Sequence, residues 1–488
     1  MSYAIVVKKE CETCQLVQPV ISDIAAQAEL KIYSQDDPGF PAGHDVVDDR
    51  ELAYSWQTQI ETVPTVIKFD AEGNEVGRTF GWVKADWEAL TGMTFDHEIP
   101  AFRPGCGSMT QDPGMPEKLA AKYEADSLQA REIQLGSEED EIEACFDRGW
   151  SDGLPVVPPT RERVLRMLSG TRRAADEVVG TVPPDLNDCT IEKIAINAVM
   201  AGCKPEYMPV VIAAVEAALQ EPFCMHGLLA TTYFSGPLVI VNGPVSRAIG
   251  MNAGGNALGQ GNRANATIGR ALQLVIRNVG GGKPGGVDRS VFGNPGKYTF
   301  CFAEDELNSV WESLAVERGF APEDSTVTLF AADGLQGIVD QKSRDPESLC
   351  RSFAAGLRVV GHPKMVLAAD AILVVSPEHE RVFRLAGWSK QRVRDELLAL
   401  LTIPGSELVA GAGGIAEGLP DKFADASLPK FRENGLHIVR AGGTAGMFSA
   451  IIAGWAASGT TGSDMVSMKI RDRKLVALQA QGTEYREN

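Results

Sequence analysis

Apolar residues follow two spacings along the first ninety residues. Short apolar runs such as 4–7 are typical of buried strands, whereas Val17, Val20, Ile21 and Ile24 recur at the spacing of one helix face. In chain order the pattern predicts a strand at 4–7, a helix at 11–28, a strand at 30–33, a helix at 49–59, strands at 62–69 and 75–80, and a helix at 83–90. Residues 1–93 therefore form a β-α-β-α-β-β-α unit in this prediction.

Residues 94–136 follow neither spacing. Their many prolines and glycines are typical of irregular chain, so the segment is predicted to be a linker. Ser137 and the four acidic residues after it are typical of a helix start. A larger body is expected to begin there.

Strand and helix patterns alternate through residues 137–488. The predicted helices are 190–202, 205–219, 264–278 and 391–401, and the predicted strands are 237–242, 326–330, 371–375 and 436–440. Such alternation is typical of an α/β fold, here a multi-layer body of one or two subdomains.

Composition narrows the function classes. The formal net charge is −19 and no long Lys/Arg cluster occurs, which argues against binding to nucleic acid or anionic lipid. No apolar run reaches the roughly 18 residues of a membrane span, and no signal-peptide pattern is present. Nine scattered cysteines, an odd number, predict a reducing cytoplasm and free thiols.

Cys11 and Cys14 stand between the first predicted strand and helix. A thiol at the start of a helix lies at its positive end, which favours the thiolate, and the second thiol is one turn away. Together with Val63-Pro64-Thr65, the pair resembles the thioredoxin family. The resemblance implies that Cys11 attacks, that Cys14 resolves, and that Pro64 is a cis proline in the substrate-docking loop.

The flanking residues depart from that family. Glu10 replaces its usual Trp, and Glu12-Thr13 replaces Gly-Pro between the cysteines, which leaves the substrate range open. Carboxylates beside Cys11 predict a less stable thiolate, hence a reducing couple near the roughly −270 mV of thioredoxin. The alternatives are an inert docking domain or half of a metal site. No second Cys-x-x-C or nearby His pair supports zinc.

A glycine-rich loop at 250–263 precedes the predicted helix at 264–278. Backbone N–H groups at such a helix start bind anions, and Asn256, Asn262 and Arg263 would add side-chain donors. The loop at 442–446 is a second candidate. The alternative for both is a tight turn that allows close helix packing. Residues 259–264 also match a dinucleotide-binding pattern, but the preceding strand ends too early for NAD.

Two further residues are candidates for chemistry in the body. Cys203 lies between two predicted helices beside Lys204, and both features favour a thiolate; the alternative is a small buried core residue. His226 precedes a glycine in a loop, where it would act as acid or base or serve a structural role.

Lys297 and Glu304 bracket a short apolar strand, and we expect them to reach one cavity from its two ends. Both would then bind a small-molecule substrate.

Three stretches of the body, 149–159, 262–270 and 376–379, resemble a bacterial family associated with selenoproteins that carry a Sec-Gly-Ser-Cys motif. The resemblance implies reductive thiol or selenol chemistry. The nearest stretch here, Cys106-Gly107-Ser108-Met109, lacks the second thiol.

The leading hypothesis is a thiol-dependent oxidoreductase. Its body binds a small anionic substrate, and the Cys11/Cys14 unit supplies reducing equivalents without a cofactor beyond its redox-active disulfide. One alternative is a hydrolase or lyase that uses Cys203 or His226, with the first unit as a docking module. Another is a non-catalytic subunit of a redox complex. A redox partner protein and a homo- or hetero-oligomer are also expected.

Overall fold

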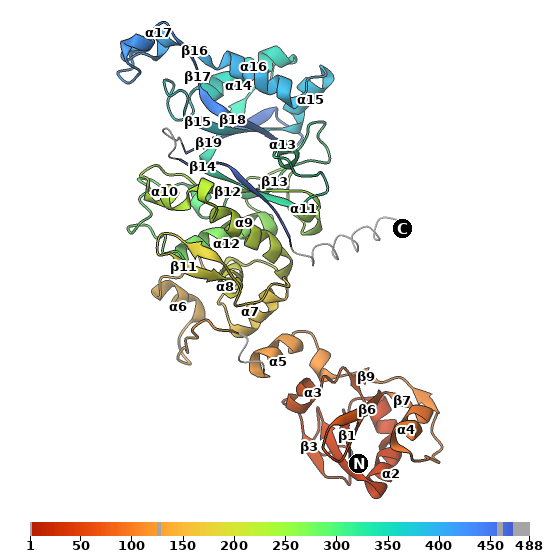
Figure 1. Cartoon of the computed structure of the whole chain (residues 1–488). Coiled ribbons are helices and arrows are strands. Elements are labelled where there is room, and N and C mark those ends of the chain that lie inside the picture. Colours follow the sequence, from red (N-terminus) through yellow and green to blue (C-terminus); the bar gives the residue numbers. More distant parts are fainter. Residues whose placement is uncertain (1, 124–127, 456–461, 472–488) are drawn as a thin grey trace. The chain divides into compact units, whose positions relative to one another are not determined.

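The computed structural model describes residues 2–123, 128–455 and 462–471. The chain forms two compact units, Met1–Ser127 and Leu128–Asn488, called unit 1 and unit 2 (Figure 1). The α/β fold predicted from the sequence is confirmed.

Unit 1 is built on a five-stranded mixed sheet in the order β3-β2-β1-β5-β6. β1 runs parallel to β2 and antiparallel to β5, and its Ile5, Val6 and Val7 are fully buried. The elements are β1 (Ser2–Val7), α1 (Glu12–Leu16), α2 (Gln18–Gln27), β2 (Glu29–Ser34), β3 (Val46–Asp48), α3 (Ala53–Gln57), β4 (Thr62–Val63), β5 (Thr65–Phe69), β6 (Glu75–Phe80), β7 (Trp82–Val83), α4 (Lys84–Thr91), β8 (Phe102–Arg103), β9 (Cys106–Gly107), the 3-10 helix η1 (Met109–Gln111) and α5 (Met115–Tyr123).

The single helix predicted over residues 11–28 is two helices. α1 ends at Leu16 and α2 begins at Gln18, with Pro19 in the first turn of α2. Proline has no backbone N–H to donate to the preceding turn, so the helical hydrogen-bond ladder is interrupted there. The break leaves the cysteine pair on a short helix of its own.

Residues predicted to be a linker belong partly to unit 1. β8 pairs with β7, and β9 pairs with β4. Gly105 allows this close approach, because a Cβ there would lie 2.3 Å from Cγ2 of Thr62 and 2.8 Å from the carbonyl oxygen of Val63. We call residues 102–111 the strap. The strands β8 and β9 could not be predicted, because this proline- and glycine-rich sequence follows neither the strand nor the helix spacing of apolar residues.

Unit 2 contains a seven-stranded sheet in the order β13-β12-β14-β19-β15-β18, and β20 also pairs with β14. The elements of unit 2 are α6 (Glu141–Asp147), α7 (Arg161–Leu168), β10 (Val178–Val182), β11 (Asn187–Thr190), α8 (Ile191–Ala201), η3 (Pro205–Tyr207), α9 (Met208–Ala218), η4 (Glu221–Phe223), α10 (Met225–Ala230), β12 (Gly236–Asn242), α11 (Pro244–Ala248), α12 (Arg263–Asn278), η5 (Pro295–Lys297), β13 (Cys301–Ala303), α13 (Leu314–Glu317), β14 (Thr326–Val339), α14 (Pro346–Arg358), β15 (Ala369–Val375), α15 (Pro377–Leu385), α16 (Lys390–Leu400), β16 (Thr402–Pro404), α17 (Gly405–Leu408), η6 (Ala412–Gly414), η7 (Asp421–Phe423), β17 (Ser427–Pro429), β18 (Phe431–Arg440), β19 (Phe448–Gly454) and β20 (Val466–Lys469).

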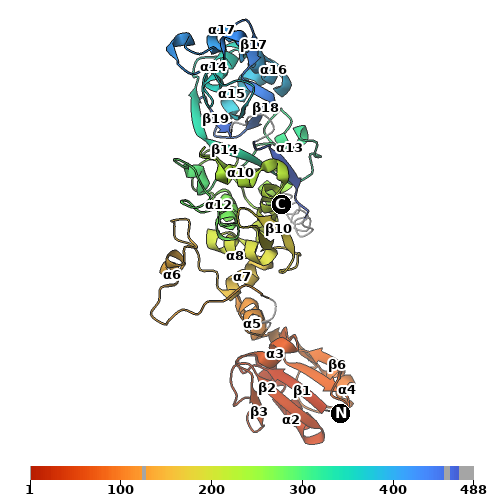
Figure 2. The same ribbon diagram turned by 60° about the vertical axis from the view of Figure 1, so that its left-hand side comes forward.

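The long strand β14 joins the two halves of this sheet. Its first half pairs with β12 and β20 and its second half with β19, and the register shifts between Ala332 and Leu335. Helices α8, α9 and α12 lie on the β12 side, whereas α14, α15 and α16 lie on the β15 and β18 side (Figures 1 and 2). An apolar cluster that includes Ile240 of β12 and Ile372 of β15 contains residues from both halves of the sheet.

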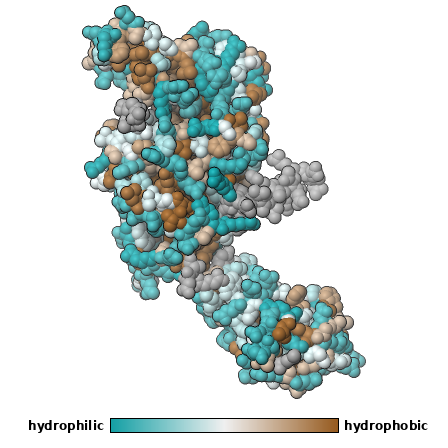
Figure 3. All heavy atoms as spheres, viewed as in Figure 1, coloured by the Kyte–Doolittle hydropathy of each residue, from teal (hydrophilic) through white to brown (hydrophobic). Residues whose placement is uncertain are grey.

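The predicted helices and strands of the body are all present as α8, α9, α12, α16, β12, β14, β15 and β18. Among the described residues, no single helix has the length and apolar composition of a membrane span, and α9 with α10 passes that test only as a pair bent by 74°. Hydrophilic residues cover most of the face shown in Figure 3, with smaller apolar patches between them.

Candidate functional site

The cysteine pair lies at the start of α1, directly after β1. Cys11 is the N-cap residue, and its Sγ accepts a hydrogen bond from the backbone N–H of Cys14 at 3.4 Å. Both side chains are fully buried, and both cysteines are free thiols. This is the helix-start position predicted from the sequence.

The Val63–Pro64 loop lies against the pair. Its peptide bond is cis, as the resemblance implied, and Cys11 Sγ lies 3.6 Å from the carbonyl oxygen of Val63. Pro64 is therefore beside the thiols, where the sequence placed it.

A third cysteine, which sequence reasoning missed, completes this cluster. Cys106 on the strap pairs with Val63 in the β4–β9 ladder and donates a thiol hydrogen bond to Cys11. Among the described residues, no group of three or more His, Cys, Asp or Glu side chains has the arrangement of a metal site. One signal was available in the sequence: Cys106 stands between two glycines, a pattern typical of close backbone approach.

The three thiols have different proton affinities. The side-chain hydrogen bond from Cys14 lowers the pKa of Cys11 to about 5, against the effect of burial; the Cys106 thiol and the N–H groups at the helix start act in the same direction. Burial raises the pKa of Cys14 far above its ordinary value. Burial and the hydrogen bond to Cys11 also raise the pKa of Cys106. Cys11 thus carries the thiolate.

The predicted destabilisation of that thiolate by Glu10 and Glu12 is wrong. The carboxylate of Glu12 forms an ion pair with Arg103 of the strap, which neutralises its charge. Hydrogen bonds to the sulfur lower the pKa of Cys11, because they act at contact distance in a buried site.

In unit 2, the prediction of a reactive Cys203 is contradicted. α9 begins at Met208, after the 3-10 turn η3, so this cysteine is not at the start of a long helix. Its side chain is buried and its Sγ donates to the carbonyl oxygen of Thr267 at 3.4 Å. Burial raises the pKa of Cys203 to about 12. The alternative, a small core residue, fits these contacts.

The glycine-rich loop at 250–263 uses its side-chain donors internally. Asn262 caps α12 and donates Nδ2 to the carbonyl oxygen of Gly250 at 2.8 Å, and Asn256 Nδ2 donates to that of Gln260 at 2.5 Å. Nε of Arg263 donates to the carbonyl oxygen of Gly202 at 2.9 Å. These bonds favour the packing alternative over an anion site.

The two glycine-rich loops also meet. The backbone N–H of Gly442 donates to the carbonyl oxygen of Ala253 at 2.9 Å. The two loops, far apart in the sequence, are therefore in direct backbone contact.

His226, Lys297 and Glu304 do not share a site. His226 is exposed on the short helix α10. Glu304 is buried, where its carboxylate accepts from Nδ2 of Asn242 at 2.7 Å and from the N–H of Leu314 at 2.8 Å, and burial raises its pKa. Lys297 lies in a separate cavity, so the expected common cavity of Lys297 and Glu304 is wrong. His226 and Cys203 form no catalytic pair.

A buried charge cluster lies near Glu304, where β13 and β18 end. Arg440 Nη1 contacts the carboxylate of Asp305 at 2.5 Å, and its Nε lies 3.3 Å from the carboxylate of Glu380. Glu380 also accepts from Ser309 and from the N–H of Val310. The charges in this cluster face one another, so it fastens the two halves of the sheet.

The cavity that contains Lys297 measures about 480 Å³ and lies beside Gly236, at the start of β12. Nζ of Lys297 binds Asp288 at 2.7 Å. Four buried polar atoms of the lining residues have no hydrogen-bond partner among the described residues: Ser235 Oγ, Gln273 Nε2, Arg277 Nε and Asn294 Oδ1. Buried polar groups are normally paired, so this lining has the character of a binding site. Its apolar wall includes Met225, Leu228 and Leu229.

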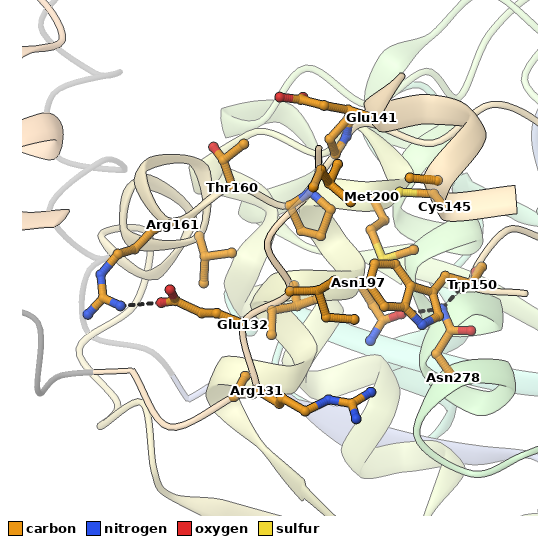
Figure 4. A pocket seen from close by; sticks show the side chains of 18 of the residues that line it. Arg131, Glu132, Glu141, Cys145, Trp150, Thr160, Arg161, Asn197, Met200 and Asn278 are labelled. Atoms are coloured by element: carbon orange, nitrogen blue, oxygen red, sulfur yellow. Dashed lines mark hydrogen bonds and ion pairs between the residues drawn. The ribbon is translucent and has the colours of Figure 1, made fainter. Parts of the chain in front are cut away.

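A larger cavity, about 760 Å³, separates the segment after residue 128 from α7 and α8 (Figure 4). Several of its polar groups are paired, and Asn278 Oδ1 is a buried polar atom of its lining without a hydrogen-bond partner among the described residues. Arg161 forms an ion pair with Glu132, and Nδ2 of Asn278 donates to Asn197 Oδ1 and to the carbonyl oxygen of Trp150 (Figure 4). These contacts fasten the segment to the helices, so the cavity of Lys297 is the better candidate for a ligand.

No protein-family model matches the chain, and no curated protein matches it.

Proposed function

We propose that the protein is a thiol–disulfide oxidoreductase whose redox centre is Cys11 and Cys14. The supporting observation is the stabilised thiolate of Cys11 at a helix start, next to a buried thiol of raised pKa and the Val63–Pro64 loop. The parallel and antiparallel pairing of the unit 1 sheet supports the resemblance to thioredoxins. Cys11 attacks a disulfide that is brought to it, and Cys14 then attacks Cys11 to release the reduced thiol.

The lowered pKa sets the expected redox potential. Thioredoxin combines a thiol pKa of about 7 with a potential of about −270 mV. A lower pKa keeps the thiol ionised at pH 7 and so stabilises the reduced form; a thiol pKa of about 5 in place of about 7 corresponds to roughly 2 kcal/mol, or about 40–50 mV for two electrons. The couple is therefore expected near about −220 mV, where it exchanges electrons with the glutathione pool of a reducing cytoplasm.

The electrons of the Cys11–Cys14 pair reduce a small anionic substrate that is bound by unit 2. The cavity of Lys297 supports this part of the proposal, because Arg277 and Gln273 both line it and each has a buried nitrogen, Nε and Nε2, without a hydrogen-bond partner among the described residues. The apolar wall suits a carboxylate with a hydrocarbon part. Because both units are on one chain, the effective concentration of the reductant is on the order of millimolar.

The redox centre is tested on the whole chain in glutathione buffers of graded potential at pH 7. Free thiols are alkylated with N-ethylmaleimide. The mass of the tryptic peptide 10–31, which contains both cysteines, is then measured by mass spectrometry. We expect a Cys11–Cys14 disulfide with a midpoint near about −220 mV, unchanged in Cys203→Ser. Absence of this disulfide at every potential contradicts the proposal.

The ligand cavity is tested by native mass spectrometry of the purified protein. We expect a small acid to co-purify with the wild type and with Arg263→Met, and to be lost from Arg277→Met. Arg263 is the matched control because its guanidinium is bound to a backbone carbonyl outside this cavity. The same bound molecules in all three proteins would remove the cavity from the proposal.

A further inference from the structure

The strap covers the redox pair. Cys11 is 0 % exposed, whereas Cys106 is only partly buried. Cys106 therefore remains partly open to a disulfide outside the protein while the strap stays in place, whereas Cys11 is closed to it. Thiol–disulfide exchange needs direct attack of one sulfur on another, so access decides which thiol meets the substrate.

Contacts along the strap hold Cys106 at a fixed place. Thr13 Oγ1 donates to the carbonyl oxygen of Pro104 at 2.6 Å, and Nζ of Lys8 donates to that of Gly107 at 3.0 Å. Farther along, the N–H of Ser108 donates to the carbonyl oxygen of Glu61 at 2.9 Å. Because Cys106 pairs with Val63, whose carbonyl oxygen also contacts Cys11, the backbone itself brings the two thiols together.

We propose that Cys106 is a third redox-active cysteine, which carries electrons from the covered pair to a disulfide substrate outside. This inference rests on the proposed function of Cys11 and Cys14. Cys106 forms a transient disulfide with Cys11 in place of Cys14.

The exchange balances in three steps. Cys106 loses its proton as it attacks a substrate disulfide and forms a mixed disulfide, and the substrate thiolate that leaves takes this proton. Cys11 attacks the Cys106 sulfur, releases the second substrate thiolate and leaves a Cys11–Cys106 disulfide. Cys14 loses its proton and attacks Cys11, which restores Cys106 as a thiol and leaves Cys11–Cys14. Cys106 takes the proton that Cys14 loses. The substrate thus gains two electrons; one of its thiolates keeps the proton given up by Cys106, and the other takes a proton from water, because Cys11 is already ionised at pH 7.

The first experiment traps the intermediate in the whole chain. Cys14→Ser removes the final step, and oxidised glutathione serves as the substrate disulfide. Non-reducing mass spectrometry should find tryptic peptides 10–31 and 85–118 joined through Cys11 and Cys106, and the double variant with Cys203→Ser should behave identically. Glutathione on Cys11 with a free Cys106 thiol overturns the inference.

The second experiment keeps Cys14 and measures the rate at which oxidised glutathione produces the Cys11–Cys14 disulfide. The serine in Cys106→Ser still offers a hydrogen-bond donor to Cys11. A slower reaction of this variant therefore shows that oxidised glutathione needs the Cys106 thiol to reach the pair. We expect at least about a tenfold decrease in Cys106→Ser and none in Cys203→Ser, with unchanged circular dichroism. An equal rate in Cys106→Ser overturns the relay while the redox pair stands. A wild type that forms no Cys11–Cys14 disulfide overturns the proposed function as well.

Discussion

Replacing Cys106 by alanine removes one hydrogen-bond donor from the Cys11 thiolate. A hydrogen bond to a charged group contributes about 1.5 kcal/mol at the lower end of the usual range, which corresponds to about one pKa unit. The pKa of Cys11, now about 5, should therefore rise by about one unit. Because Cys11 stays ionised at pH 7 in both proteins, the whole loss falls on the reduced form. The Cys11–Cys14 potential should decrease by about 30 mV.

Both quantities are measurable on the whole chain. The thiolate absorbs near 240 nm, so a pH titration of each protein, minus that of its Cys11→Ser counterpart, isolates Cys11 from the other cysteines. The potential follows from glutathione equilibration with mass-spectrometric detection. Cys203→Ser, which alters a buried thiol in unit 2, should change neither value. If the midpoint and the potential of Cys106→Ala equal those of the wild type, then the Cys106 thiol does not stabilise Cys11.

Three further predictions concern packing and charge. Gly105→Ala places a Cβ against β4 and should lift the strap, so that iodoacetamide alkylates Cys11 faster; Gly107→Ala, whose Cβ meets open space, should not. Arg440→Ala leaves two buried carboxylates unpaired and should lower the free energy of unfolding by about 3–5 kcal/mol, as measured by urea unfolding. Burial raises the pKa of Asp333 to about 6, so the folded protein binds the extra proton and loses stability as pH rises from about 4 to 6. Asp333→Asn should remove that loss. Calorimetry at several pH values would then show a difference in Tm between the variant and the wild type that grows from about pH 4 to 6 and stays constant above about pH 6.

The sequence predicted those helices and strands that depend on residues close to one another in the chain. The spacing of apolar residues located α8, α9, α12, β12 and β15 to within a few residues, because one face of each element must be buried, whereas β14 continues to Val339, well past the predicted 326–330. The position of Cys11 at a helix start and the proline loop at Val63–Pro64 were also predictable, since each depends on a few neighbouring residues.

The candidate site depended on contacts between distant segments. Cys106 was placed in a linker because its flanking prolines and glycines follow no spacing, yet β9 pairs it with β4. The sequence neighbours of Cys203 predicted a reactive thiol, but burial raises the pKa of this thiol instead. The donors of the glycine-rich loop looked free for an anion, but α8 and the loop itself occupy them.

The sequence by itself therefore determined the order of the longer predicted elements and the position of the cysteine pair that we propose as the redox centre. The tertiary structure decided which thiol carries the charge, which one is covered and which cavity keeps unpaired polar atoms. The physical reason is that backbone conformation responds to near neighbours, whereas the pKa of a thiol and the partners of a buried polar group depend on desolvation and hydrogen bonds from residues far along the chain.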